Sequence, residues 1–214
     1  MNDETEITNL IRIFQQFEIY RNILPKEHNE FVKEQIQKDY DIGLKTYVLQ
    51  GKTYTGTYRE DSQRTDNKEA YQKESKLATV LASMGFDVIL IEEDNTKPGT
   101  KPDAIVNGIV MDFKEIKALN EHEIGKNALG HNYQDGIHKA YSEGVVIYLH
   151  NFSEEFVKNN MSFEKTSPTH NGIALFFHED SGKLQLIDME KVRAAHFEQN
   201  MPRKTPDTFI EPSD

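Results

Sequence analysis

An Asn-Gly pair at residues 107–108, flanked by apolar residues, is the feature that most constrains how this chain of 214 residues can fold. Both positions of a two-residue hairpin turn need positive φ, and Asn-Gly is the pair that supplies it most readily. The predicted register pairs residues 104–106 with residues 109–111 and places Asp103 opposite Asp112. Directly paired side chains point to the same face of a hairpin, with Cβ atoms roughly 4.5–5.5 Å apart. The sequence therefore predicts two carboxylates side by side.

A lysine is expected on the same face as these carboxylates. Lys114 follows Asp112 by two residues, which is the repeat of a strand. Two adjacent carboxylates repel each other unless a cation lies between them, and oxygen ligands suit Mg²⁺. Such a cation polarises a phosphate and lowers the pKa of a bound water, while a lysine stabilises the growing charge. The pattern favours metal-assisted cleavage of phosphodiester bonds.

A helix with one unusual glutamate is predicted before the hairpin, from about residue 66 to residue 84. Asp66 and Glu69 form a capping-box-like start, and Gly85 follows as a stop. Glu74 lies on the apolar stripe of this helix, together with Leu77, Ala78 and Leu81. A carboxylate on an apolar stripe needs a partner, and the predicted metal pair is the candidate. Glu69 is the rival acid, but the first turn favours acids for its dipole alone.

These motifs resemble a known superfamily. Pro102-Asp103, eight intervening residues and then Asp112-Phe113-Lys114 are similar to the signature of PD-(D/E)xK nucleases. This resemblance implies an α/β fold with a restriction-endonuclease-like core, in which helices flank a mixed central sheet. It also implies that Glu74, Asp103 and Asp112 bind Mg²⁺ or Mn²⁺, with Zn²⁺ less favoured, and that Lys114 positions or activates water.

A narrower resemblance covers Glu74 through Lys114. This stretch is similar to the C-terminal nuclease domains of contact-dependent growth inhibition proteins, the CdiA type. The shared features are a glutamate on a helix ending in Met-Gly-Phe, an apolar strand, Lys-Pro-Asp, the Asn-Gly hairpin and Asp-Phe-Lys. The resemblance implies a toxin-like endonuclease that acts on tRNA or DNA and an immunity protein as partner.

Further residues are candidates for contact with substrate. Lys117 follows the hairpin, and His131, Gln134 and His138 share one stripe of a helix predicted over residues 121–142. Such a stripe can line a cleft and contact phosphates or bases. A polar face turned to solvent is the alternative interpretation.

Composition sets limits on this interpretation. The formal net charge of −11 argues against tight nonspecific binding to DNA and weakly favours a structured RNA. No apolar run of about 18 residues is present, so we expect no membrane contact. The acidic start, residues 1–6, does not resemble a signal peptide, and we expect a cytoplasmic location. With no cysteine in the sequence, disulfides and thiolate ligands are excluded.

The chain is predicted to contain three parts. Residues 1–62 form an accessory segment, residues 63–198 a nuclease-like domain, and residues 199–214 a tail containing proline. The elements expected besides those above are helices over residues 4–22, from Pro25 and over 153–159, and β structure over 44–58, 86–91, 145–149, 172–177 and 184–188. The strand over residues 145–149 follows a helix, which favours a parallel pairing.

Two other functions remain open at this point. The chain could be a non-catalytic interaction or structural module of a mobile element that retains the nuclease fold. It could also be a regulatory domain whose acidic surface mimics nucleic acid. Metal binding by Asp103 and Asp112 separates the catalytic interpretation from both.

Overall fold

The computed structural model describes residues 24–38, 41–49, 52–60, 68–91, 101–117, 128–161 and 172–200. Within these ranges, eight strands form one mixed sheet in the order of the chain. The strands are β1 (Asp41–Leu49), β2 (Lys52–Glu60), β3 (Asp87–Leu90), β4 (Ala104–Val106), β5 (Ile109–Lys117), β6 (Gly144–His150), β7 (Ile173–His178) and β8 (Lys183–Asp188). The helices are α2 (Lys26–Gln37), α3 (Lys68–Ser83), α4 (Ala128–Ile137), α5 (Glu154–Asn160) and α7 (Met189–Asn200).

The predicted hairpin between β4 and β5 is confirmed. Ala104 pairs with Met111 and Val106 with Ile109, as the Asn-Gly turn requires. Asn107 has φ of 46° and Gly108 has φ of 81°, the positive values expected for a two-residue turn. The mixed α/β fold class is also confirmed, because β5, β6 and β7 pair in parallel while the β7–β8 and β1–β2 pairs are antiparallel.

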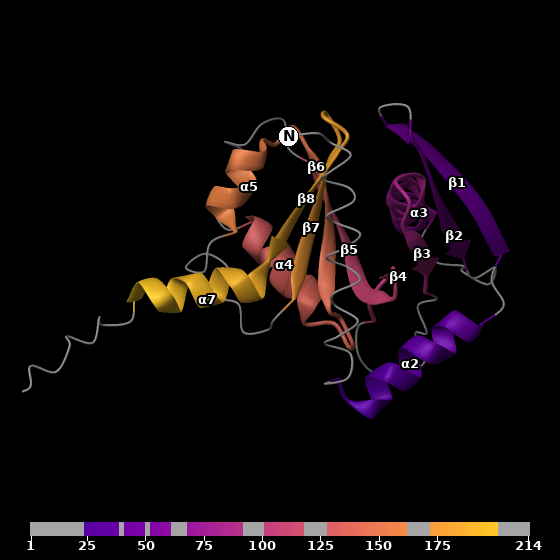
Figure 1. The fold of residues 1–214 in the computed structure, drawn as a ribbon, viewed down its shortest axis with the longest axis horizontal. Helices are drawn as coiled ribbons and strands as arrows, with labels where there is room; N and C mark the ends of the chain where they lie inside the picture. The colour runs from indigo at the N-terminus through magenta and orange to yellow at the C-terminus, as the bar shows by residue number, and fades with distance from the viewer. Residues whose placement is uncertain are drawn as a thin grey trace, which may run out of the picture.

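Helices cover both faces of a curled sheet (Figure 1). Helix α3 packs on one face through Leu77, Ala78 and Leu81, which join a core cluster with side chains of β3 to β7. Helices α4, α5 and α7 contribute to a second cluster on the opposite face of β6 and β7. Helix α2 packs Val32 against a third cluster built from β3, β4 and β5. Alternate residues of β5 therefore face different helices.

The sheet divides beside β5, and this division positions the site. Strand β4 has three residues whereas β5 has nine, so their pairing ends at Ala104 and Met111. Asp103 and Asp112 are the next residues along each strand. The Ile91 amide donates to the Asp103 carbonyl at 2.9 Å, which keeps Asp103 attached to the β3 side of the division. Asp112 remains in the parallel ladder with β6.

The N-terminal region contributes to the same sheet. Strand β2 pairs in parallel with β3 through residues 57–60, so the β1–β2 hairpin extends the sheet beyond residues 63–198. The predicted part boundaries near residues 62 and 198 stay predictions. The helix predicted over residues 4–22 and the proline-containing tail lie outside the described residues.

Two expectations about helices were wrong in detail, and one helix was not predicted. Helix α4 ends at Ile137 rather than at residue 142, because Tyr141 has φ of 64° and the chain turns back to β6. The predicted start of this helix lies outside the described residues. The spacing of Phe31, Val32 and Ile36 predicts one apolar side for α2, but Ile36 is 42% exposed. Helix α7 was not predicted, although Asp188 accepts the Glu190 amide at 3.0 Å as its capping residue.

Among the described helices, none is long and apolar enough to cross a membrane.

Strand β2 packs closely against the backbone of the turn between α3 and β3, and this packing gives a prediction about stability. A Cβ on Gly56 would overlap the backbone carbonyl oxygens of Ala82 and Phe86, which cannot move as a side chain would. We expect Gly56→Ala to lower the free energy of unfolding by about 2 kcal/mol or more in urea titrations. Thr55→Ala, at the exposed neighbouring position, is the control. Equal stability of the two variants would contradict this close packing.

Candidate active site

Two aspartates are buried where the sheet divides. Asp103 is 4% exposed and Asp112 is fully buried. The Asp103 carboxylate accepts the Phe113 amide at 2.7 Å, so the side chain of Asp103 continues the pairing that the β4 backbone has ended. This contact holds the two carboxyl groups together. The proximity predicted from the Asn-Gly register is therefore present in the structure.

Two lysines neutralise the aspartates. The Lys114 ammonium lies 2.8 Å from Asp112 Oδ2, as the alternation of β5 predicted. The Lys139 ammonium contacts Asp112 Oδ1 and lies 3.2 Å from Asp103 Oδ1. Lys139 was not among the predicted site residues, because it follows a helix end and shares no strand or helix repeat with the motif. Tertiary packing alone brings it between the carboxylates.

The charges of this cluster are strongly coupled. Burial raises the pKa of Asp103 to about 8, the Asp112 charge adds to the rise, and the Lys139 charge opposes it. Burial lowers the pKa of Lys139, but the Asp103 and Asp112 charges outweigh burial and the net direction is upward. Asp103 therefore keeps its proton more readily than an exposed aspartate does, and Lys139 keeps its proton as the cation that compensates the ionised carboxyl groups.

A glycine lets α4 approach the site closely. A Cβ on Gly136 would lie 2.8 Å from Asp112 Oδ2 and 2.6 Å from Val145 Cγ2. The sequence shows Gly136 only as a weak point of a helix, whereas the packing shows that a larger residue would push α4 away from Asp112. This close approach places the end of α4, and hence Lys139, over the aspartates.

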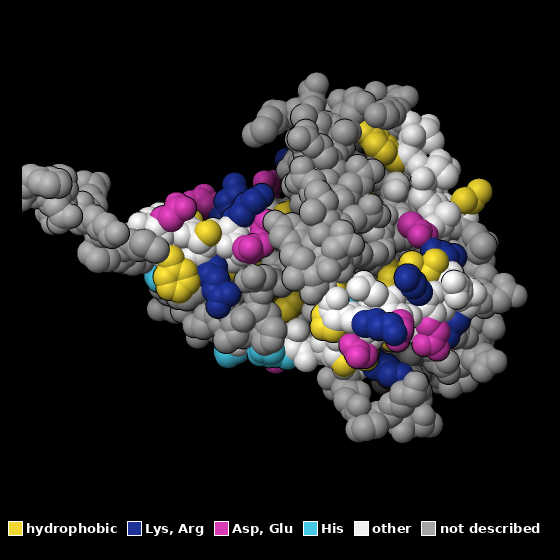
Figure 2. Space-filling model, turned by 60° about the horizontal axis from the view of Figure 1, so that its bottom comes forward, with side chains coloured by type: hydrophobic (Ala, Val, Ile, Leu, Met, Phe, Trp, Pro, Cys, Tyr) yellow, Lys and Arg dark blue, Asp and Glu magenta, His cyan; other side chains and the backbone are white. Residues whose placement is uncertain are grey.

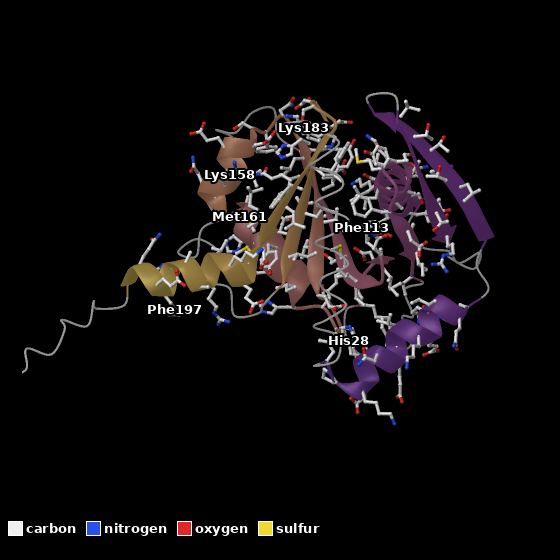
Figure 3. All side chains as sticks on the ribbon, in the orientation of Figure 1. His28, Phe113, Lys158, Met161, Lys183 and Phe197 are labelled. Carbon is white, nitrogen blue, oxygen red and sulfur yellow. The ribbon has the colours of Figure 1, made fainter. Side chains whose placement is uncertain are left out.

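The turn that carries Lys139 is fixed on both sides. The Glu143 amide donates to the Val110 carbonyl at 2.8 Å, and Glu143 Oε2 accepts the Val110 amide at 3.0 Å. From α2, His28 Nε2 lies 3.1 Å from Glu143 Oε2, and His28 is labelled in Figure 3. The ring of Phe31 stacks on Tyr141 with 4.7 Å between centroids. Helix α2, which belongs to the predicted accessory segment, therefore packs against this turn and stabilises it.

A pocket of about 300 Å³ opens on the α3 side of β5. Glu74 lies in it with Lys114, and its charge adds a smaller contribution to the raised pKa of Asp103. Phe113, which Figure 3 labels near α3, and Tyr148 form apolar walls. Its other lining residues are Glu69, Lys73, Lys76, Leu77 and Glu115. The apolar stripe predicted beside Glu74 is present, because Leu77, Ala78 and Leu81 are all buried, while the choice of Glu74 over Glu69 stays a prediction since both line the pocket.

Ion pairs form one side of this pocket. His150 contacts both Glu179 and Glu115, the latter at 3.0 Å from Nε2. The Tyr148 hydroxyl donates to Glu179 Oε1 at 2.8 Å, and the Lys76 ammonium lies 3.0 Å from the same oxygen. These contacts join α3, β5, β6 and the end of β7, and in them acidic groups lie next to basic ones.

The predicted substrate-contact residues lie elsewhere. Lys117 is at the end of β5, 3.2 Å from Glu115, and its side chain is largely exposed. His131 and His138 are exposed on α4 and just after it, and Gln134 is half-buried between them. The opposite face of α4 is buried against the sheet, so the predicted polar stripe is real. None of these four residues lines the pocket, and their contact with substrate stays a prediction.

The aspartate pair suits a divalent cation. Both carboxylates reach one ammonium, which marks a single point that an oxygen-bound cation could occupy. Glu74 does not complete this set, since the described residues contain no group of three or more His, Asp or Glu placed to hold a metal. Two of the three predicted ligands, Asp103 and Asp112, therefore meet at one point, and the third, Glu74, lines the adjoining pocket.

The described surface gives no simple guide to a partner. In the view of Figure 2, basic and acidic side chains are interspersed over the described residues of that face. Among the described residues of that face, no continuous basic area for nucleic acid is seen, in keeping with the net charge of −11.

Comparison with known proteins adds little to these observations. No protein-family model and no curated protein matches the sequence. Among solved structures, a chain of the CdiA-CT/CdiI toxin and immunity complex from Burkholderia pseudomallei is similar, with 15% identity and a TM-score of 0.43. The match covers 60% of this chain and 98% of the other. A likeness this weak carries no argument about the chemistry of the site.

The raised pKa of Asp103 predicts a pH dependence of stability without metal. Asp103 has a pKa of about 8 when folded and an ordinary value of 3.8, so it binds its proton more tightly in the folded state. Its stabilising contribution is complete below about pH 4 and is lost as pH rises through about 8. Asp103→Asn lacks this group. In urea titrations with chelator, the unfolding free energy of wild type minus that of the variant should fall from pH 5 to pH 9. A constant difference would contradict the raised pKa.

Proposed function

We propose that this protein is a divalent-metal-dependent endonuclease that hydrolyses phosphodiester bonds in tRNA or DNA. The observation that carries this proposal is the convergence of two buried carboxylates, Asp103 and Asp112, on one cation position beside Lys114. Burying two like charges together is costly unless the site serves a purpose such as holding a cation.

Each residue has a role in this proposal. Asp103 and Asp112 hold the cation, for which Mg²⁺ and Mn²⁺ are the best candidates because all donors are oxygens. The bound cation supplies Lewis acidity and lowers the pKa of water. Lys114 offers an ammonium 2.8 Å from Asp112, where it can stabilise negative charge on the phosphate. Glu74 remains the third predicted ligand and borders the site from α3.

The pocket on the α3 side is a suitable place for the substrate strand. It contains Lys114 and therefore adjoins the reaction centre. Phe113 and Tyr148 provide apolar walls, while Lys73 and Lys76 place ammonium groups along α3. Nucleic acid strands bind to such combinations of cationic and aromatic groups.

A non-catalytic function is the second candidate, and one observation favours it. Lys114 and Lys139 already form ion pairs with the two aspartates, so the charges of the cluster are balanced without a metal. A relic of the nuclease fold acting as an interaction module would retain such a cluster. A toxin-like role and an immunity partner stay proposals drawn from the sequence resemblance.

Cleavage assays test the proposed chemistry. Purified protein is incubated with total tRNA and with plasmid DNA, each with Mg²⁺, Mn²⁺ or chelator. We expect metal-dependent cutting of one substrate, slowed about 100-fold or more in Lys114→Ala and in Asp112→Asn, because the ammonium and the cation act on the transition state. Lys158→Ala, an exposed lysine on α5, is the matched control. Cutting that survives both site variants would refute the assignment, and a folded wild type that neither cuts nor binds metal favours the non-catalytic module.

The substrate pocket has a separate test. Lys73→Gln removes an ammonium that is 45% exposed and borders the pocket. We expect weaker binding of whichever nucleic acid the protein cleaves. The slope of log affinity against log salt concentration should fall by the equivalent of about one phosphate contact. Lys26→Gln, whose side chain is 84% exposed on α2, should change neither. Binding is measured by fluorescence anisotropy between 50 and 200 mM salt, about the range over which such slopes are resolved. An unchanged slope for Lys73→Gln places the substrate outside the pocket.

A further inference from the structure

We propose that Lys139 is a built-in competitor for the cation site, which must move out before a divalent metal can bind between Asp103 and Asp112. This inference rests on the proposed metal-dependent function and adds to it a residue that controls entry to the site. It begins from position, because the Lys139 ammonium contacts Asp112 Oδ1 and lies 3.2 Å from Asp103 Oδ1.

Formal charge makes simultaneous occupancy unfavourable. With both aspartates ionised, as metal binding requires, the two aspartates and the two lysines in direct contact carry no net charge together. Adding a divalent cation to this cluster would leave two uncompensated positive charges beside the fully buried Asp112. A buried net charge of that size is costly, so one ammonium has to leave.

Lys139 is the ammonium that can leave. The two lysine side chains are 15% exposed for Lys139 and 23% exposed for Lys114, so exposure does not choose between them and their places in the fold do. Lys114 belongs to β5, inside the sheet, and lies on the pocket where substrate is proposed to bind. Without Lys139, a divalent cation, two carboxylates and Lys114 have one net positive charge, which matches one phosphodiester.

The backbone around Lys139 shows that its position is set by the fold. The Lys139 amide donates to Gly136 at the end of α4, and its carbonyl accepts the Ser142 amide at 3.1 Å. Helix C-termini favour cations, which adds to the attraction of the carboxylates. Helix α2 holds the same turn through Phe31 on Tyr141. These backbone and packing contacts hold Lys139 near the aspartates, whereas a flexible surface lysine would lack them.

Metal binding in the absence of nucleic acid tests the inference. We compare Mn²⁺ affinity by calorimetry in wild type, Lys139→Met, Lys139→Arg and the control Lys158→Met. Lys139→Met should bind Mn²⁺ about tenfold or more tightly than wild type, because a competing positive charge next to the ligands has gone. Lys139→Arg keeps the charge and should not gain affinity. A lysine with a purely structural role would weaken or leave unchanged the metal binding when removed, so equal or weaker binding by Lys139→Met overturns the inference.

Labelling of the wild-type protein gives a second readout that does not depend on a variant folding. An amine-reactive reagent followed by peptide mass spectrometry measures the accessibility of each lysine. Modification of Lys139 should increase when Mn²⁺ is added, while that of Lys158 stays constant. Unchanged labelling of Lys139 at saturating Mn²⁺ overturns the inference.

The two proposals fail in different ways. If wild type binds Mn²⁺ and cuts nucleic acid while Lys139→Met binds Mn²⁺ no more tightly, the nuclease assignment stands and the role of Lys139 is refuted. If neither wild type nor Lys139→Met binds Mn²⁺, the metal-dependent function fails and the inference fails with it.

Discussion

Two carboxyl groups buried side by side are the constraint on which the rest of this structure depends. Asp112 is fully buried and Asp103 nearly so, and each would repel the other without a cation between them. The fold meets this requirement in two ways. Asp103 accepts the Phe113 amide, which replaces a backbone pair that the short β4 cannot supply. Lys139 and Lys114 then provide the opposite charges. Both solutions require the sheet to divide at this point.

The division of the sheet also explains how the aspartates and the pocket on the α3 side come into contact. Strand β5 carries Asp112 towards α4, while Phe113 packs in the cluster that contains α3. Lys114 pairs with Asp112 and also lines the pocket on the α3 side. A substrate in that pocket would therefore approach the aspartates through Lys114. The arrangement gives one lysine contact with both the aspartate pair and the pocket, as the proposed metal-assisted cleavage would need.

The N-terminal segment has a larger share in this site than its sequence suggests. Helix α2 contacts the turn after α4 through His28 and Phe31, and this turn carries Lys139. The β1–β2 hairpin extends the sheet next to β3. Both contacts join residues more than 25 positions apart, so neither leaves a periodic pattern in the sequence. The role of Gly136 leaves no periodic pattern either. In the sequence it looks like a helix breaker, whereas in the structure its lack of a side chain lets α4 lie close to Asp112.

The sequence by itself determined the local parts of the site. An Asn-Gly turn favours one register, so the proximity of Asp103 to Asp112 and the side of β5 on which Lys114 lies were expected from the hairpin, although the backbone pairing ends one residue earlier, at Ala104 and Met111. Helical phase in the same way selected Glu74. Tertiary structure decided which cation meets the carboxylates, where α4 ends and how Glu74 stands relative to the aspartates. Those features depend on packing between distant elements and on the balance of charge in a buried cluster. Neither quantity is encoded by the spacing of residues along a strand or helix.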